Sequence, residues 1–340
     1  MRELAPETAV EYLRETKRVP PGRGVRVRAL GWGVSNVVMR VDVEGGPPFV
    51  LKQARERLRT KALWVSRLDR IWTEQAALEL LSPLLPDGAV PRVLFADEAN
   101  YLFAMTCAPD DSAVWKEQLL AGAADLEVAR RAGRLLGALH AETRGQPALE
   151  SGPLADGTVF DQLRIDPFYR TIARAHPEAA PRIDSLIHSL LHPPRRGFVH
   201  GDFSPKNLLV HRQGITLVDF ETAHAGDPAY DVGFFLSHLL LKSVRAAPDD
   251  GPVLALVPAF LEAYIESVGT WADPDFMKRA GAHLAANALA RVDGKSPVDY
   301  LDEPRREAVR RFALVALQEE EGPDELILLL ARGMQSFKEK

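Results

Sequence analysis

Cysteine is almost absent from this chain, which has only Cys107 among its 340 residues. A single cysteine excludes a disulfide within the chain and a zinc site built from cysteines. The sequence also lacks an uninterrupted apolar run of about 18 residues, the length expected of a membrane-spanning helix. Its net charge of −5 gives no basic excess of the kind that binds nucleic acid or anionic membranes. We therefore expect neither nucleic acid nor membrane as a partner.

Targeting signals, repeats and low-complexity segments are missing as well. The N-terminal stretch MRELAPETAVEYLRE is charged early and amphipathic, which is unlike a signal peptide, so we expect a cytoplasmic protein. The content of 46% hydrophobic and 26% charged residues is typical of a soluble globular protein. The length suits one large domain or two lobes.

The order of predicted elements divides the chain into two parts. A helix over about residues 6–16 is followed by valine-rich alternating runs with Gly-rich turns, which predict strands. A helical segment over about 61–82 and further strand-like sequence follow, and helical periodicity then dominates, interrupted only by a hairpin around 208–219. We predict an α+β fold of two lobes. The small β-rich lobe spans residues 1–108, and the larger, mainly helical lobe spans 109–340.

The most informative segment is HGDFSPKNLLVHRQGITLVD, which runs from His200 to Asp219. The short runs LLV and ITLVD predict a β-hairpin that returns Asp219 to the neighbourhood of Asn207. Transfer of a γ-phosphate requires a carboxylate that receives the acceptor hydroxyl, and oxygen ligands that hold Mg²⁺ on the phosphates. The segment therefore predicts a phosphoryl-transfer site, with Asp202 as the catalytic carboxylate and with Asn207 and Asp219 as metal ligands. The alternative, that His200 and Asp202 only cap a buried turn, does not explain the spacing of all four polar residues.

This segment resembles a known family. Its loop has the kinase pattern H-x-D-x-x-x-x-N, and Asp219-Phe220-Glu221 stands where kinases have D-F-G. The H-G-D form, the D-F-E form and the GDPAYD stretch that ends at Asp231 resemble the aminoglycoside phosphotransferase and choline kinase family. The resemblance implies a protein-kinase-like fold, with ATP and Mg²⁺ as cofactors. It also implies that Asp231 is buried and braces the catalytic loop.

The resemblance extends to the nucleotide-binding side. A G-x-G between strands is usually a hairpin turn, but GWGVSN is similar to the family's phosphate loop and implies that Gly33 and Ser35 lie nearest the phosphates. Lys52 ends an apolar strand and is either an edge charge or, at the family's position, the cation that pairs with the phosphates. Glu74 fits as its partner on the next helix, with Glu79 as the alternative.

The segment YLFAMTCAP resembles the family's passage from strand to hinge. By that resemblance the Thr106 carbonyl and the Ala108 N–H hold the adenine edge. Cys107 between them is expected to be a packed or half-exposed thiol and not a nucleophile. The basic stretch before the next helix, which ends with Arg67 and Arg70, predicts a solvated helix face, with phosphate contact as the alternative.

The acceptor side is rich in polar groups beside aromatics. We predict that some of its residues line the acceptor pocket, namely Asp161, Arg164, Asp166 and Tyr169. The alternative is that Asp166 and Pro167 only start a helix.

The chain between Asp219 and Asp231 is short, and no A-P-E sequence follows it. A peptide acceptor normally needs a longer segment there, so a protein kinase is disfavoured and we expect a small-molecule hydroxyl acceptor. An aminoglycoside-like compound is one candidate, and methylthioribose, choline or a homoserine-type metabolite are others. A nucleotide-binding regulator without turnover is a further alternative, which the complete set of candidate residues argues against.

Overall fold

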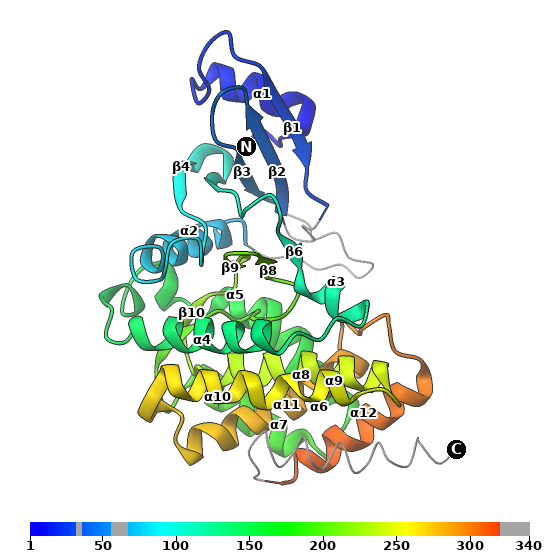
Figure 1. The fold of residues 1–340 in the computed structure, drawn as a ribbon. Coiled ribbons are helices and arrows are strands. Elements are labelled where there is room, and N and C mark those ends of the chain that lie inside the picture. Colours follow the sequence, from blue (N-terminus) through cyan, green and yellow to red (C-terminus); the bar gives the residue numbers. More distant parts are fainter. Residues whose placement is uncertain (32–35, 56–66, 320–340) are drawn as a thin grey trace.

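Figure 1 shows the computed structural model of the chain, a small N-terminal lobe built on a sheet above a larger helical lobe. The structure describes residues 1–31, 36–55 and 67–319. The predicted phosphate-loop residues Gly33 and Ser35 lie outside the described residues, as does the first part of the helical segment predicted over 61–82.

The N-terminal lobe contains an antiparallel five-stranded sheet in the order β1-β2-β3-β5-β4. Its strands are β1 Val25–Ala29, β2 Asn36–Val43, β3 Phe49–Ala54, β4 Val93–Asp97 and β5 Leu102–Thr106. All six residues of β3 are buried, because this strand is central and pairs with β2 on one side and β5 on the other. A residue on β3 is therefore held rigidly.

The alternation of side chains along β3 determines what each residue meets. Phe49 and Leu51 point to the face covered by α1 (Pro6–Glu15), where they pack in one apolar cluster. Val50 and Ala54 point to the opposite face and pack in the cluster that includes α2 (Arg70–Leu81). Lys52 lies between these two in the same alternation and so faces α2.

The C-terminal lobe packs mainly helices, which cross below the sheet in Figure 1. The longer helices are α4 Leu126–Glu142, α7 Ala180–Leu191, α8 Ala229–Ala246, α10 Leu256–Val268, α11 Pro274–Asp293 and α12 Glu303–Ala316. The shorter ones are α3 Trp115–Leu120, α5 Thr158–Phe160, α6 Thr171–Ala175 and α9 Gly251–Leu254, with 3₁₀ turns η1 Glu98–Asn100, η2 Pro147–Leu149, η3 Pro153–Ala155 and η5 Gly269–Trp271.

Short strands cross this helical lobe at the catalytic loop. The predicted hairpin is β8 Leu208–His211 with β9 Gly214–Leu217, and β6 Ala113–Val114 extends it to three strands. A second pair joins β7 Gly197–Val199 to β10 His224–Gly226. The expectation that only one hairpin interrupts the helices is therefore wrong, because strands of two or three residues leave no periodic signal in the sequence.

The segment Asp161–Arg170, η4, is a helix with π-type hydrogen bonding that contains Pro167 in its interior. The interpretation of Asp166 and Pro167 as a helix start is therefore wrong. Asp166 is instead held from outside the segment, because its carboxylate accepts a hydrogen bond from Lys295 at 2.7 Å.

One described helical stretch, Gly251–Trp271, is long and apolar enough to cross a membrane. Half of it is buried inside the protein, and within it α10 packs closely along α4. Its apolar residues therefore contribute to the core of the helical lobe, since Phe260 and Tyr264 are fully buried there.

Candidate active site

The predicted catalytic loop lies between β7 and β8 and is fixed from below by Asp231. The buried Asp231 carboxylate accepts hydrogen bonds from the backbone N–H groups of His200, at 2.6 Å, and Gly201, at 2.9 Å. Gly201 has a φ of +76°, and a Cβ there would lie 2.8 Å from the Thr222 carbonyl oxygen, so this turn requires glycine. Asp231 thus braces the loop as the sequence predicted.

His200 holds the loop and does not point at a reacting atom. Its Nδ1 accepts the backbone N–H of Asp202 at 3.1 Å, which leaves Nε2 protonated to donate to the Val218 carbonyl at 3.3 Å. Burial lowers the pKa of His200, so the ring stays neutral in this role.

Asp202 lies among cationic and amide donors. One carboxylate oxygen is 2.9 Å from the Arg164 guanidinium, and the other accepts from Lys206 at 2.8 Å and from the Asn207 amide at 2.8 Å. Burial alone would raise the pKa of the Asp202 carboxyl, but Arg164 and Lys206 outweigh it and hold the pKa well below its usual range. The group is therefore a carboxylate at neutral pH.

The hairpin brings the two predicted metal ligands together. Val218 donates its N–H to the Asn207 carbonyl at 3.1 Å, so Asp219 follows directly beside Asn207, with a left-handed φ of 72°. Asn207 uses its amide NH₂ on Asp202, which leaves its amide oxygen for a cation. Among the described ranges, no group of three or more His, Cys, Asp or Glu is placed to hold a metal. One carboxylate and one amide oxygen nevertheless suit Mg²⁺, which takes its other ligands from phosphates and water.

Lys52 reaches this site from the sheet. Its ammonium lies 2.5 Å from Glu74 on α2 and 2.7 Å from Asp219, whereas Glu79 instead accepts a hydrogen bond from Gln75. Burial lowers the pKa of Lys52, but Asp219 and Glu74 raise it more, so the ammonium stays charged. The structure thus joins Lys52, Glu74 and Asp219 across the two lobes.

The predicted adenine-binding residues lie at the end of β5 and just beyond it. Thr106 is the last residue of the strand. Its backbone N–H donates to the Arg92 carbonyl at 2.9 Å, and its hydroxyl accepts from the Arg92 backbone N–H at 2.9 Å. Ala108 follows in the half-buried passage to the helical lobe. Cys107 is half-buried, and burial raises the pKa of its thiol, which makes it a poor nucleophile.

A buried polar cluster near Lys52 was not predicted. The Glu221 carboxylate accepts hydrogen bonds from the Asn36 amide at 2.8 Å and from Arg70 Nε at 3.2 Å. Arg70 is fully buried, so the prediction of a solvated helix face is wrong for this residue. Its partner lies about 150 positions away in sequence, and no local pattern could have indicated the contact.

The four residues proposed for the acceptor side separate in the structure. Arg164 reaches Asp202 and also donates to the Gly201 carbonyl at 2.8 Å. Tyr169 is fully buried and hydrogen-bonded to His283 at 2.8 Å, so it belongs to the core. Asp161 pairs with Arg170, and Asp166 pairs with Lys295. Of these four, only Arg164 contacts Asp202.

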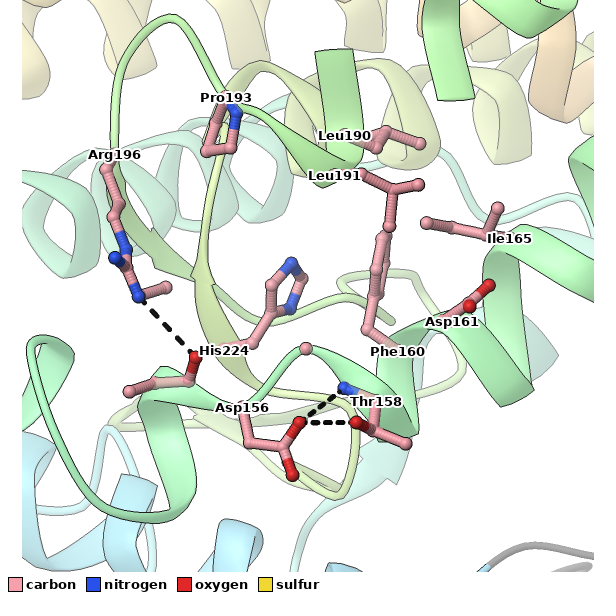
Figure 2. A pocket seen from close by; sticks show the side chains of 13 residues that line it. Asp156, Thr158, Phe160, Asp161, Ile165, Leu190, Leu191, Pro193, Arg196 and His224 are labelled. Carbon is pink, nitrogen blue, oxygen red and sulfur yellow. Dashed lines mark hydrogen bonds between the residues drawn. The ribbon is translucent and has the colours of Figure 1, made fainter. Parts of the chain in front are cut away.

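A cavity of about 350 Å³ lies near η3 and β10, and Asp161 is one of its lining residues. Figure 2 shows Phe160 and His224 at its centre, where the two rings stack with centroids 4.1 Å apart. None of Lys52, Asp202 or Asp219 lines it. This cavity is therefore distinct from the catalytic loop.

The fold and the site together define the class of this protein as a kinase-like phosphotransferase. The sheet of the small lobe holds Lys52 next to the Glu74 carboxylate on α2. The loop of the helical lobe, which Asp231 braces, holds Asp202 and Asn207. The chain belongs to the phosphotransferase enzyme family (APH), whose family model matches residues 26–279. The aminoglycoside phosphotransferase resemblance is thereby confirmed.

Known proteins agree with this assignment. Methylthioribose kinase 2 of Oryza sativa subsp. japonica is 26% identical over 271 residues, which cover 71% of this chain and 63% of that protein. The chain thus spans less than two thirds of this relative's length.

Two solved structures show the same fold. A choline/ethanolamine kinase family protein from Mesorhizobium loti has a TM-score of 0.54 at 18% identity and covers 96% of this chain and 99% of that one. The amicoumacin kinase hAmiN in complex with AMP-PNP, Ca²⁺ and Ami has a TM-score of 0.55 at 17% identity and covers 93% and 96%. The predicted bilobal, protein-kinase-like fold is confirmed.

Proposed function

We propose that the protein is an ATP-dependent O-phosphotransferase that transfers the γ-phosphate to a hydroxyl of a small molecule. The observation that carries this proposal is the convergence of Lys52, Asp202 and Asp219 on one site from both lobes. Lys52 lies 2.7 Å from Asp219, and Lys206 lies 2.8 Å from Asp202 and 4.0 Å from Asp219. The amicoumacin kinase with AMP-PNP and Ca²⁺ supports a nucleotide and a divalent cation as cofactors. Because ATP is the donor, the proposed location is the cytoplasm.

Asp202 acts on the acceptor hydroxyl. The hydroxyl oxygen attacks the γ-phosphorus, and the bond from this phosphorus to the oxygen that bridges it to the β-phosphate breaks. The products are a phosphate monoester and ADP. Because the pKa of Asp202 is held well below its usual range, the carboxylate orients the alcohol at first. It takes the proton only when formation of the new bond has made that proton acidic.

The remaining residues hold the donor. Lys52, positioned by Glu74, neutralises charge on the phosphates as it develops in the transition state. In this proposal the Asn207 amide oxygen and the Asp219 carboxylate would hold Mg²⁺, which would supply charge neutralisation to the donor phosphates. Gly33 and Ser35 contact the phosphates, and the Thr106 carbonyl and Ala108 N–H hold the adenine edge.

The first test measures Mg²⁺-dependent release of ADP from ATP against a panel of hydroxyl compounds. The panel holds aminoglycosides, choline, methylthioribose, homoserine and simple sugars, with Asp202→Asn as the blank and the exposed Asp184→Asn as the matched control. We expect one class to stimulate release in the native protein and the control but not in Asp202→Asn. Equal turnover by Asp202→Asn would refute the assignment, and nucleotide binding without any turnover would favour a regulator.

A further inference from the structure

Two cations, one buried and one half-buried, lie near the catalytic loop without a carboxylate partner among the described residues. Lys242 on α8 is 3% exposed, and its ammonium donates to the backbone carbonyl of His238 at 3.2 Å. Arg291 on α11 is half-buried and donates to the Ser296 backbone carbonyl and, at 3.0 Å, to the Ser296 hydroxyl. Within the described ranges, neither side chain forms an ion pair, although buried cations are normally paired.

Aromatic rings connect these cations to the catalytic aspartate. Arg164, which binds Asp202, lies over the rings of Phe168 and Phe234 at 5.7 and 5.8 Å. The Arg291 guanidinium lies 5.8 Å from the centre of the same Phe168 ring. His238, whose carbonyl holds Lys242, packs its own ring on Phe234 at 4.9 Å. Arg164 and Arg291 therefore share the Phe168 ring, which stacks on Phe234, and Lys242 is linked to Phe234 through His238.

Further unpaired polar atoms lie at the same place. Arg291 Nε and the Tyr300 hydroxyl are buried and have no hydrogen-bond partner among the described residues. Lys242 lies 5.7 Å from the centre of the Tyr300 ring. Tyr300 also lines an adjoining depression of about 540 Å³, together with Asp299 and Asp302. The cluster thus contains unmet donors, and it shares Tyr300 with this depression.

A third cation, Lys116, lies on α3, whose first turn contacts the catalytic loop. The backbone N–H of Lys116 donates to the Pro205 carbonyl at 2.9 Å, which fixes the first turn of α3 against the loop. Burial lowers the pKa of Lys242 to about 7, and the charges of Lys116 and Arg291 contribute to the same shift. Burial and the Arg164 charge lower the pKa of Arg291. The charges of Asp202 and Asp299 act in the opposite direction, but the pKa stays lowered. Holding these positive charges near one another away from water is energetically unfavourable unless an anion binds beside them.

We propose that Lys242 and Arg291 bind an anionic group of the acceptor, a carboxylate or a phosphate, while its hydroxyl lies at Asp202. The inference rests on the proposed function and names the acceptor class for that site. It favours hydroxy acids such as homoserine and phosphorylated alcohols. It disfavours cationic acceptors such as aminoglycosides and choline, because these would meet like charge next to Asp202.

The experiment has a turnover arm and a binding arm. The turnover arm compares ADP release with homoserine and glycerate, with glycerol phosphate, and with choline and kanamycin. It uses the native protein, Lys242→Met and the control Lys295→Met, a half-exposed lysine that pairs with Asp166. We expect anionic acceptors to be used, and Lys242→Met to raise their KM about 10- to 100-fold with little change in kcat, as for loss of a charged hydrogen bond. Lys295→Met should behave as the native protein does.

The binding arm does not depend on turnover. With Mg²⁺ and ADP at saturation, malonate and inorganic phosphate are added at constant ionic strength and the thermal midpoint is measured. We expect both anions to raise the midpoint of the native protein and of Lys295→Met, but not that of Lys242→Met. Carboxylates and phosphates are distinguished by which of the two shifts is larger.

Each outcome separates this inference from the proposed function. Turnover only with compounds that lack a carboxylate or phosphate group would support the phosphotransferase and overturn the anion site. An anion shift that Lys242→Met abolishes, without turnover of any acceptor, would support the anion site and count against the proposed function. Equal shifts in the native protein and Lys242→Met, or no shift in either, would overturn the inference.

Discussion

Arg164 is the residue on which the orientation of Asp202 depends most directly. Its Nε holds the Gly201 carbonyl at 2.8 Å while its terminal nitrogen holds Asp202 at 2.9 Å. A lysine has a single nitrogen and cannot reproduce both contacts in one plane. The loop and the carboxylate are therefore tied together by one planar group.

We predict that Arg164→Lys lowers kcat about 10- to 100-fold, because the carboxylate loses its fixed orientation, and leaves the KM for ATP almost unchanged. Steady-state kinetics with ATP and acceptor varied separately would measure this. Arg170→Lys is the control, since Arg170 pairs with the half-exposed Asp161 away from the loop. An unchanged kcat in Arg164→Lys would show that Asp202 needs no such support.

Arg70 gives a second prediction at this scale. Replacement by Met removes the Arg70 charge from the buried Glu221 carboxylate, which should lower the free energy of unfolding by about 3 kcal/mol. Arg67→Met, in the same segment but half-exposed, should cost less than about 1 kcal/mol. Urea denaturation of both variants tests the difference, and equal losses would contradict the assigned role of the buried cluster.

Single residues also show how much of the site the sequence could predict. Asp202, Asn207 and Asp219 stand within one short segment, so their spacing alone predicted that they converge. The contacts of Arg70 and Arg164 join distant segments and depend on how the helices pack. Lys242 and Arg291 lie on separate helices, α8 and α11, with no motif around them.

At the scale of elements, α4 and α10 approach each other through two glycines. A Cβ on Gly133 would overlap the Phe260 carbonyl oxygen, and one on Gly137 would lie 2.9 Å from the Tyr264 carbonyl oxygen. Glycine is unfavourable in a helix interior by about 1 kcal/mol relative to alanine. The close packing of the two helices offsets that cost.

We predict that Gly133→Ala destabilises the protein by about 1–3 kcal/mol, because the helices must separate to admit the methyl group. Gly251→Ala in α9 is the control, since nothing lies within 4 Å of a Cβ there, and its helix propensity should improve slightly. Thermal or urea unfolding measures both. Stabilisation by Gly133→Ala would mean that the contact is looser than the structure shows.

The elements themselves were predictable to different degrees. Long amphipathic helices such as α4 and the hairpin of β8 and β9 carry a clear period or turn, and the sequence predicted them. Among the residues that the structure describes, the strands β7 and β10 pair only with each other, and they span three residues each. η4 keeps a proline in its interior, against the usual rule for helices.

For the whole molecule, stability should depend on pH through buried histidines. Burial lowers the pKa of His283 to about 4, and that of His224 also to about 4, below the value near 6.5 expected in the unfolded chain. Below pH 6.5 the unfolded chain therefore binds protons that the folded protein cannot. The free energy of unfolding should fall as the pH drops from about 6.5 to 4, and these two groups should add no slope above 6.5.

Urea denaturation at several pH values would measure this slope. His283→Gln should reduce the slope of the unfolding free energy against pH by the contribution of roughly one proton, and the rest of the slope should remain. The Asp202 carboxylate has a pKa well below its usual range. The stabilisation that it contributes is therefore lost only at lower pH. An identical slope in His283→Gln would show that His283 is protonated in the folded state.

Between the lobes, the polypeptide crosses near Cys107, and side chains add further attachments. Asn36 and Arg70 are bound to Glu221, and Lys52 is bound to Asp219. Attachments at several points resist rotation about any single axis. We therefore expect the two lobes to move apart only when the Lys52–Asp219 ion pair is exchanged for contacts with the donor phosphates.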